Sequence, residues 1–397
     1  MSNHAPLLHA LLKQTKLGVE RRRLMHWLNA PQRLLAPRPL LEGSPNPGLT
    51  NQILSLIGVI ILANLSAAKL VLPPFTEPAP LGTILPFDGL FDITSFKVAL
   101  GGTVQFAADH SALLNATHQH HNLGQDRGWF FYKASESFPQ LMHIETRVLQ
   151  ALRPSRGITS EAQRYAALLR LPSGKFGCIH PRIERDMLKA IRFNRAGELP
   201  PLSHYFGAQW ATQFPTIRRH PQVFVPVSLD VRKQDAERLR RGTSWNGTVA
   251  RTGHLTRSAG SQTLAALLDF TICNSAAWFM GWSGSTYSRL LGAKATQRGR
   301  PHFVACPSPV RTCRVRTSSD TERRYLLSHS FCLALTVQLE EARKRKGLRD
   351  SRAMPQHASS SLDAEDLHVD QHHVDLQRFL RNHSMDCTFG AASSEHA

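Results

Sequence analysis

The sequence lacks the short motifs that mark the commonest nucleotide and hydrolase sites. It has no GxGxxG and no GxxxxGK[ST], so the usual dinucleotide and nucleoside-triphosphate loops are missing. It has neither the HExxH of zinc proteases nor the GxSxG of serine hydrolases. No Asp-x-Asp occurs, which argues against a diphosphate held through a metal ion. A diphosphate bound by this chain would have to be neutralised by Arg, Lys and backbone amides.

Cysteine is scarce, with six residues at positions 178, 273, 306, 313, 332 and 387. No CxxC occurs, so structural zinc is not expected. The even count permits disulfides without arguing for them in a chain of 397 residues. Histidine is frequent and clusters at 118–121 and 368–373. Neither cluster has a partner set at ligand spacing, so solvated loop histidines are favoured over metal ligands.

Acidic residues are few, and this leaves the chain strongly basic. Asp and Glu number 29 against 48 Lys and Arg, which gives a net charge of +19 and a pI near 10.4. Residues 1–40 hold +6 and residues 341–397 hold −1, so residues 41–340 hold +14. Such a charge suggests an anionic partner: nucleic acid, a membrane surface or a phosphorylated small molecule.

Long apolar runs are missing except at 53–63, ILSLIGVIILA. A membrane span needs about 20 apolar residues, and this run ends at Ala63, before Asn64 and Lys69. A buried helix is therefore favoured over a membrane anchor. The N-terminus does not have the form of a standard signal peptide, because His9 interrupts its apolar stretch. Its Arg-rich, acid-poor character would also suit an organelle transit peptide.

Strands alternate with helices in two successive stretches, which predicts two α/β domains with parallel sheets. The first stretch has a strand at 39–41, a loop rich in Pro and Gly at 43–48, a helix at 51–68 with Thr50 as N-cap, and a strand at 70–72; residues 147–171 read as mostly helical. The second has strands at 176–179, 223–227 and 278–280, and helices at 232–241, 262–274 and 285–291.

The length and the hydrophobic fraction of 42% fit two folded domains with tails. We expect a basic N-terminal extension at 1–40, a first domain at 41–175 and a second domain at 176–341. Residues 342–397 are Ser- and His-rich and are expected to be mostly disordered, with a short helix near 374–380.

Three segments of the chain carry a family signal together. The first is GLTNQ at 48–52, which leads through the apolar helix to LVLPPF at 70–75. The second is HPRIERDM at 180–187, and the third is AALLDF at 265–270 followed by FMGWSGSTY at 279–287. Their order and spacing resemble the GDP-fucose protein O-fucosyltransferase superfamily over roughly residues 40–305. The stretches 102–175 and 190–260 match that family poorly.

The resemblance implies a GT-B architecture, in which two Rossmann-like, doubly wound domains face a cleft. It implies inverting, metal-independent transfer of fucose from GDP-fucose to a hydroxyl of a protein or glycan acceptor, without a cofactor. It also implies a place in the lumen of the endoplasmic reticulum or Golgi. A nucleic-acid partner is not expected, and membrane association is not favoured.

The resemblance assigns Arg182 as the catalytic residue, because a guanidinium can hold phosphate oxygens bidentately as GDP leaves. An ion pair with Glu184 or Asp186 is the alternative for this side chain. The implied donor-binding residues are Gly48, Asn51, His180, Arg182, Asp269, Ser285 and Thr286.

Each of the other assignments has a structural alternative. Ser285 and Thr286 stand at a helix N-terminus, where they could bind phosphate or simply cap the helix. Asp269 could accept bonds from a guanine or a ribose, or be satisfied by a nearby loop. Gly48 and Asn51 would shape the loop next to the sugar, or Asn51 could bond its own backbone.

The sequence identifies no general base. Glu42 stands in the first loop, but the Pro-Asn-Pro that follows departs from the family pattern, and Glu184 and His180 have no independent support. A non-catalytic relative that binds an anionic partner through its basic body therefore stays an alternative. Four glycosylation sequons are compatible with a lumenal protein, and they begin at Asn64, Asn115, Asn246 and Asn382.

Overall fold

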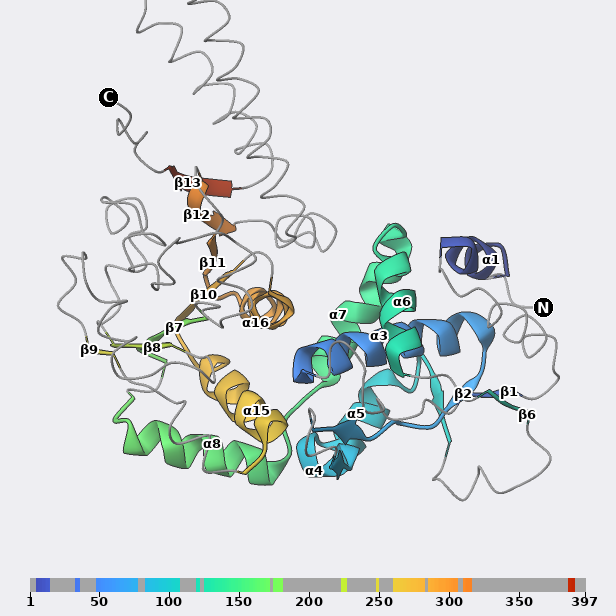
Figure 1. Cartoon of the computed structure of the whole chain (residues 1–397), viewed down its shortest axis with the longest axis horizontal. Helices are drawn as coiled ribbons and strands as arrows, with labels where there is room; N and C mark the ends of the chain where they lie inside the picture. The colour runs from blue at the N-terminus through green and yellow to red at the C-terminus, as the bar shows by residue number, and fades with distance from the viewer. Residues whose placement is uncertain are drawn as a thin grey trace, which may run out of the picture. The chain divides into compact units, whose positions relative to one another are not determined.

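The computed structural model describes residues 5–14, 33–35, 48–77, 83–107, 119–121, 125–171, 174–180, 223–226, 248–249, 260–282, 285–305, 310–315 and 385–389. Two compact units are present: unit 1 is Met1–Arg170 with Thr252–Asn274, and unit 2 is Leu171–Arg251 with Ser275–Ala397 (Figure 1). Both contain helices and parallel strands, so the chain has the α/β character that the sequence predicts. Residues 252–274, which the sequence assigned to the second domain, fold with unit 1.

Unit 1 is built around α3 (Leu49–Ser66), the apolar run that the sequence favoured as a buried helix. Among the described residues it is the one helix long and apolar enough to cross a membrane, and 89% of it is buried. Other helices of the same unit pack on it, namely α1 (Ala5–Gln14), α6 (Gln125–Ser135), α7 (Met142–Ala151) and α15 (Gln262–Cys273). The apolar surface of α3 is therefore satisfied by protein.

The helix α6 crosses α3 at a contact between two glycines (Figure 1). A Cβ atom on Gly58 would lie 1.9 Å from the carbonyl oxygen of Gly128, and a Cβ on Gly128 would lie 2.4 Å from that of Ser55. Two helix backbones can approach this closely only where neither carries a side chain.

The ends of α3 differ from the sequence expectation. The helix begins at Leu49 with Gly48 as its N-cap, so Thr50 is inside the helix and no side chain caps it. It ends at Ser66, where Ala67 takes a left-handed conformation with φ 51° and its N–H bonds the last carbonyls.

The sheet of unit 1 is small and parallel, with the order β5-β2-β1-β6. Its strands are β1 (Arg33–Leu35), β2 (Lys69–Leu70), β5 (Gln105–Phe106) and β6 (Gln119–His121). The strand expected at 39–41 lies outside the described residues, and β1 instead falls inside the expected extension. The strand β2 stops at Leu70 rather than 72, ahead of Pro73 and Pro74, which have no backbone N–H to donate.

A compact helical and hairpin region completes unit 1. It contains the antiparallel pair β3 (Phe75–Thr76) and β4 (Ile84–Leu85), and the helices α4 (Phe87–Leu90), α5 (Ile93–Leu100) and α8 (Arg156–Leu168), with a 3₁₀ turn at Pro139–Leu141. The rings of Phe75, Phe87 and Phe91 lie 5.4–6.0 Å apart and form its core.

The N-terminal helix α1 belongs to the same core. Leu8, Leu11 and Leu12 are buried, and α1 packs on α3 and α6. The first helix of the expected extension is thus a packed element, because its leucines cover apolar surface of unit 1.

Unit 2 contains a seven-stranded sheet with the order β13-β12-β11-β10-β7-β8-β9. The strands are β7 (Gly177–Ile179), β8 (Val223–Pro226), β9 (Thr248–Val249), β10 (Trp278–Trp282), β11 (His302–Ala305), β12 (Val310–Val315) and β13 (Met385–Phe389). The strands predicted near 176–179, 223–227 and 278–280 are confirmed. Residues 385–389, expected inside a disordered tail, instead form the edge strand β13.

The five strands from β7 to β11 are parallel, and their order reverses once. The chain moves outward from β7 to β8 and β9, then returns to the other side of β7 for β10 and β11. This is the order of a doubly wound sheet, and the reversal lies between β7 and β10. The helix α16 (Thr286–Gln297) connects β10 to β11 and runs beyond the predicted end at residue 291.

The middle of this sheet is closely packed around Trp278. A Cβ on Gly177 would lie 2.0 Å from the indole ring of Trp278, so the ring rests on the bare backbone of β7. Phe303 also meets the indole edge-on, with ring centroids 6.1 Å apart. This packing fixes β7, β10 and β11 relative to one another.

Candidate functional site

Two loops of unit 2 meet at the carboxyl ends of β7 and β10. His180 directly follows β7, and α16 begins just after β10. Because the two strands are parallel neighbours, both loops leave the sheet at the same edge. The N–H of His180 donates to the carbonyl of Met280 at 2.9 Å, which extends the ladder to the site.

The side chain of His180 is held by residues of α16. Its Nδ1 lies 2.7 Å from Oγ of Ser288 and 3.4 Å from Oγ of Ser285. The ring of Tyr287 packs against it with centroids 4.8 Å apart. His180, Ser285 and Ser288 are all buried. The imidazole is therefore fixed by two hydroxyls and one aromatic ring.

Ser285 and Thr286 occupy the positions that the sequence predicted for them, at a helix N-terminus after a strand. Ser285 is the N-cap of α16, and its Oγ accepts the N–H of Ser288 at 3.4 Å. The capping alternative is thus realised, and the same hydroxyl also reaches His180. The first N–H groups of a helix have no partner inside the helix and can bind an anion.

The close approach of α16 to the sheet depends on Gly281 in β10. A Cβ on Gly281 would lie 2.5 Å from the Cβ of Ser288. Any side chain there would push Ser288 away from His180. The glycine of the FMG sequence is therefore what lets Ser288 reach the imidazole.

A buried cation lies one turn into α16. Arg289 is buried, and its backbone N–H donates to the carbonyl of Ser285 at 3.0 Å. The buried charged side chains that the structure describes in unit 2, Arg289 and Lys294, are both basic. Arg289 therefore adds positive charge near the N-terminus of α16, whereas Lys294 lies in the last turn of the same helix.

The remaining predicted residues are distributed as follows. Arg182 lies outside the described residues, and Gly48, Asn51 and Asp269 belong to unit 1. Gly48 is exposed, and a Cβ there would have no atom within 4 Å. The structure thus brings together His180, Ser285 and the adjoining Thr286 in unit 2, while Gly48, Asn51 and Asp269 are described within unit 1.

Asn51 is half-buried and Asp269 is fully buried in unit 1. Oδ1 of Asn51 is buried and has no hydrogen-bond partner in the part of the chain that the structure describes, so it does not bond its own backbone. The carboxyl group of Asp269 is buried on α15, within an otherwise apolar helix.

A polar network next to Asn51 was not anticipated from the sequence. The amide of Gln52 makes two 2.8 Å hydrogen bonds with the backbone of Thr76, donating to its carbonyl and accepting its N–H. The buried carboxylate of Glu77 accepts from Oγ of Ser261 and, at 3.1 Å, from the N–H of Thr263. The N-terminus of α15 is thus anchored to the β3 segment of unit 1.

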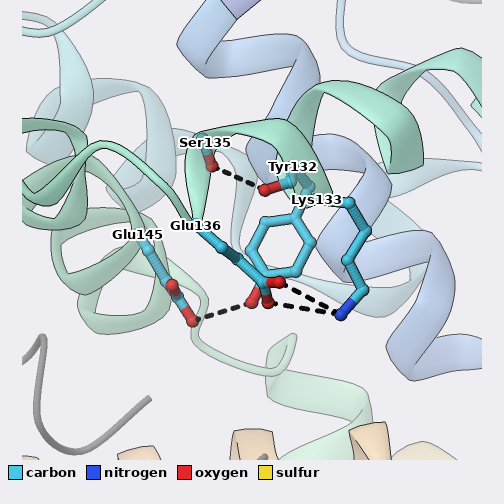
Figure 2. A network of polar contacts seen from close by, with 5 residues as sticks. All are labelled: Tyr132, Lys133, Ser135, Glu136 and Glu145. Carbon is cyan, nitrogen blue, oxygen red and sulfur yellow. Dashed lines mark hydrogen bonds and ion pairs between the residues drawn. The ribbon is translucent and has the colours of Figure 1, made fainter. Parts of the chain in front are cut away.

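Figure 2 shows a second buried carboxylate of unit 1 that the sequence did not single out. The hydroxyl of Tyr132 donates to Oε1 of Glu145 at 3.5 Å, and both side chains are buried. Glu145 lies in the first turn of α7, where the helix dipole favours a negative charge. Lys133 and Glu136 form an ion pair at 3.2 Å beside it, and Ser135 donates to the carbonyl of Tyr132 at 2.7 Å.

One of the four sequons, the one that begins at Asn64, is part of the packed structure of unit 1. Nδ2 of Asn64 donates to the carbonyl of Thr103 at 2.6 Å, and Ser66 of the same sequon is buried in α3. A glycan on this asparagine would require the hydrogen bond of its amide to break. The sequons at 115, 246 and 382 lie outside the described residues.

No family model and no curated protein matches the chain. Among solved structures, it is similar to POFUT1 in complex with GDP, at 15% identity and a TM-score of 0.43, over 67% of this chain and 95% of that one. It is similar to an Arabidopsis thaliana FUT1 variant in complex with GDP, at 14% identity and a TM-score of 0.37, over 77% and 78%. It is also similar to NodZ alpha-1,6-fucosyltransferase co-crystallised with GDP, at 11% identity and a TM-score of 0.40, over 69% and 94%.

Proposed function

We propose that the chain is a glycosyltransferase that moves fucose from GDP-fucose to a hydroxyl of a protein or glycan acceptor. The observation that carries this proposal is the meeting of His180 with Ser285 and Ser288 at the N-terminus of α16. It lies where the strand order reverses, which is the place where open α/β sheets bind ligands. The second of the three sequence segments of the resemblance begins at His180, and the third ends at Tyr287.

The same proposal includes a GT-B architecture with two Rossmann-like domains. The reversed order of the parallel strands in unit 2 supports it, and so does the parallel sheet of unit 1. The donor diphosphate is assigned to unit 2, at the first turn of α16. Gly48, Asn51 and Asp269 stay proposed donor-binding residues of unit 1.

The chemistry of the transfer fits positive groups at this edge of the sheet. As the bond between the sugar C1 and the β-phosphate oxygen breaks, its electron pair stays on that oxygen, and the sugar becomes oxocarbenium-like. The amides of α16 and the guanidinium of Arg182 are proposed to stabilise the charge on the phosphate. Removal of such a stabiliser typically lowers a rate by about 10²–10³-fold.

Inversion follows if the acceptor hydroxyl attacks C1 on the face opposite the departing phosphate. Its proton then passes to a general base. We propose that no metal and no cofactor takes part. The absence of Asp-x-Asp from the sequence supports a phosphate site made of amides and basic side chains.

We also propose that the protein acts in the lumen of the endoplasmic reticulum or Golgi. Cys178 and Cys273 are both disulfide-bonded, and disulfides persist in oxidising compartments. These two cysteines should therefore resist alkylation in the native secreted protein and react only after their disulfides are reduced. Alkylation of both without reductant would remove this support.

Thermal unfolding with added nucleotides tests the donor. GDP and GDP-fucose should raise the Tm, by the equivalent of about 2.7 kcal/mol at a hundredfold excess over Kd, whereas UDP should shift it less. Thr286→Val should reduce the shift, and Ser155→Ala, which removes the N-cap of α8, should keep it. A wild-type protein that neither guanine nucleotide stabilises would overturn the proposal.

A non-catalytic role is the second candidate, and the charge of the chain favours it. One bound diphosphate would neutralise only a small part of the net charge of +14 that residues 41–340 carry. A relative that binds a polyanion should be retained on heparin or RNA without nucleotide, and salt should release it steeply. Retention that survives high salt would count against this role.

A further inference from the structure

The antiparallel pair of β12 and β13 places two cysteines directly opposite each other at one edge of the sheet of unit 2 (Figure 1). Cys313 lies in β12 and Cys387 lies in β13, and the register makes them Cα partners. On the other side of β12 the register pairs Cys313 with Val304 of β11. Within the described strands, the cysteine that faces Cys313 is therefore Cys387.

The residues on either side of the two cysteines support this register. Arg314 lies opposite Asp386, and Thr312 lies opposite Thr388. Cross-strand pairs of opposite charge and pairs of threonines both stabilise antiparallel strands. A slip of one strand by one residue would break both of these pairs and would also separate the two cysteines.

Opposite positions of an antiparallel pair have the backbone geometry that a disulfide requires. Their Cα atoms are about 4.5–5.5 Å apart, and the two residues belong to the same face of the sheet. A disulfide spans Cα atoms that are about 4.4–6.8 Å apart. The register of Cys313 and Cys387 therefore gives a backbone separation that a disulfide can span.

We propose that Cys313 and Cys387 form an interstrand disulfide that fastens β13 to the sheet of unit 2. The inference rests on the lumenal location that is part of the proposed function, because disulfides persist in oxidising compartments. Cys178 and Cys273 already have disulfides, and the proposed pair takes neither of them.

The bond forms by exchange with a disulfide carried by another molecule, either a disulfide oxidoreductase of the lumen or oxidised glutathione. The thiolate of one cysteine attacks that disulfide and releases a first thiol, and the second thiolate then attacks the mixed disulfide and releases a second thiol. Cys313 and Cys387 together lose two protons and two electrons, and the disulfide of the other molecule is reduced to two thiols.

The link matters because β12 and β13 lie far apart in the sequence. About 70 residues separate the two strands, and holding the ends of so long a segment together costs conformational entropy. β13 has only five residues, Met385–Phe389, and its neighbour in the described sheet is β12. A disulfide keeps the ends of the segment together in every state of the chain, so it should hold this short strand in place.

Peptide mapping of the full-length protein secreted from eukaryotic cells tests the pairing directly. After free thiols are blocked and without reduction, trypsin should release residues 312–314 linked to residues 382–397, since Arg311, Arg314 and Arg381 set the ends of these peptides. The linked product should disappear on reduction. Cys313 or Cys387 joined to any other cysteine would overturn the inference.

Hydrogen exchange of the backbone amides of β13 measures the effect of the link. The double variant Cys313→Ser with Cys387→Ser removes the bond and leaves neither thiol to mispair. Exchange at 385–389 should speed up by about 10–1000-fold, the upper value being the chain-entropy limit for a loop of roughly 75 residues. Thr388→Ser is the matched control in the same strand and should change the exchange by less than about fivefold. Unchanged exchange in the double variant would refute the fastening role.

The outcomes separate the inference from the proposed function. A linked pair in a protein that binds no GDP leaves the disulfide standing and removes the donor site. Free thiols at Cys313 and Cys387 beside oxidised Cys178 and Cys273 leave the lumenal location standing and overturn the inference. If all four are free thiols, the location loses its support, and oxidised glutathione added to the folded protein decides the pairing. Failure to form the linked peptides under that treatment would then overturn the inference.

Discussion

An alanine at position 58 tests the packing of unit 1 more directly than any other single change. The added Cβ would lie 1.9 Å from the carbonyl oxygen of Gly128 and 2.7 Å from the backbone nitrogen of Tyr132. Both are backbone atoms of α6, so no side-chain rotation relieves the overlap. The whole of α6 has to move away from α3.

The size of the effect follows from that movement. Non-bonded heavy atoms are most stable about 3.5–4.0 Å apart, so α6 must retreat by more than about 1 Å. Overpacking of this kind costs about 1–3 kcal/mol, and we take the upper end because Tyr132 and its contact with Glu145 move too (Figure 2). Alanine in place of glycine inside a helix returns about 1 kcal/mol. Gly58→Ala should therefore lose about 2 kcal/mol of stability.

Thermal unfolding of the full chain measures this loss. A change of that size should lower the Tm by about 4–8 °C for a unit of this length. Gly157→Ala in α8 is the control, because that glycine is exposed and the nearest atom to its Cβ would be 4.0 Å away. The control should gain about 0.5–1 kcal/mol. A Gly58→Ala protein as stable as the wild type would refute the described contact of α3 and α6.

The described contacts lead to three further predictions. Glu77→Ala removes the acceptor for Ser261 and Thr263, so hydrogen exchange in α15 should speed up about 10–100-fold, while Glu161→Ala on the exposed face of α8 should leave α15 unchanged. In protein secreted from eukaryotic cells, mass spectrometry should find Asn64 without a glycan, because its amide is bonded inside unit 1. Hydrogen bonds from Ser95 lower the pKa of Asp92. Its stabilising effect is therefore complete above the ordinary aspartate pKa of about 3.9 and is lost as the pH falls through the lowered value. The stability gap between wild type and Asp92→Asn should accordingly narrow in acid unfolding.

The elements that the sequence predicted well are those with a local pattern. The apolar run at 53–63 gave α3, and the strand–helix alternation after residue 260 gave α15, β10 and α16. The elements it misplaced depend on partners far along the chain. Arg33–Leu35 is a short segment with no local strand signal, and it becomes β1 because β2 and β6 pair with it on both sides. In the same way, Met385–Phe389 becomes β13 because it pairs with β12.

The residues of the candidate site also fall into those that a local pattern predicts and those that only distant contacts reveal. The neighbourhood of His180 and Ser285 follows from two strands whose carboxyl ends share one edge, which a sequence pattern can suggest. Ser288 could be recognised only through its contact with His180, 108 residues away. Glu77 looks like an ordinary acidic residue after a strand, and its role appears only through Ser261, 184 residues later.

The placement of α15 shows why reading domains as continuous stretches fails for this chain. Its N-terminus is tied to Glu77 and Thr76, and its apolar face packs with α8 and α3 of unit 1. Yet residues 274–277 alone separate it from β10, the strand that ends beside Ser285. A fragment cut at 175 would therefore remove α15 from its partners and leave its buried carboxylate, Asp269, without the core that surrounds it. A buried carboxyl group is costly unless its surroundings supply hydrogen bonds or a charge partner. Such a fragment would therefore be destabilised close to β10, and the donor site proposed for unit 2 has to be studied in the whole chain.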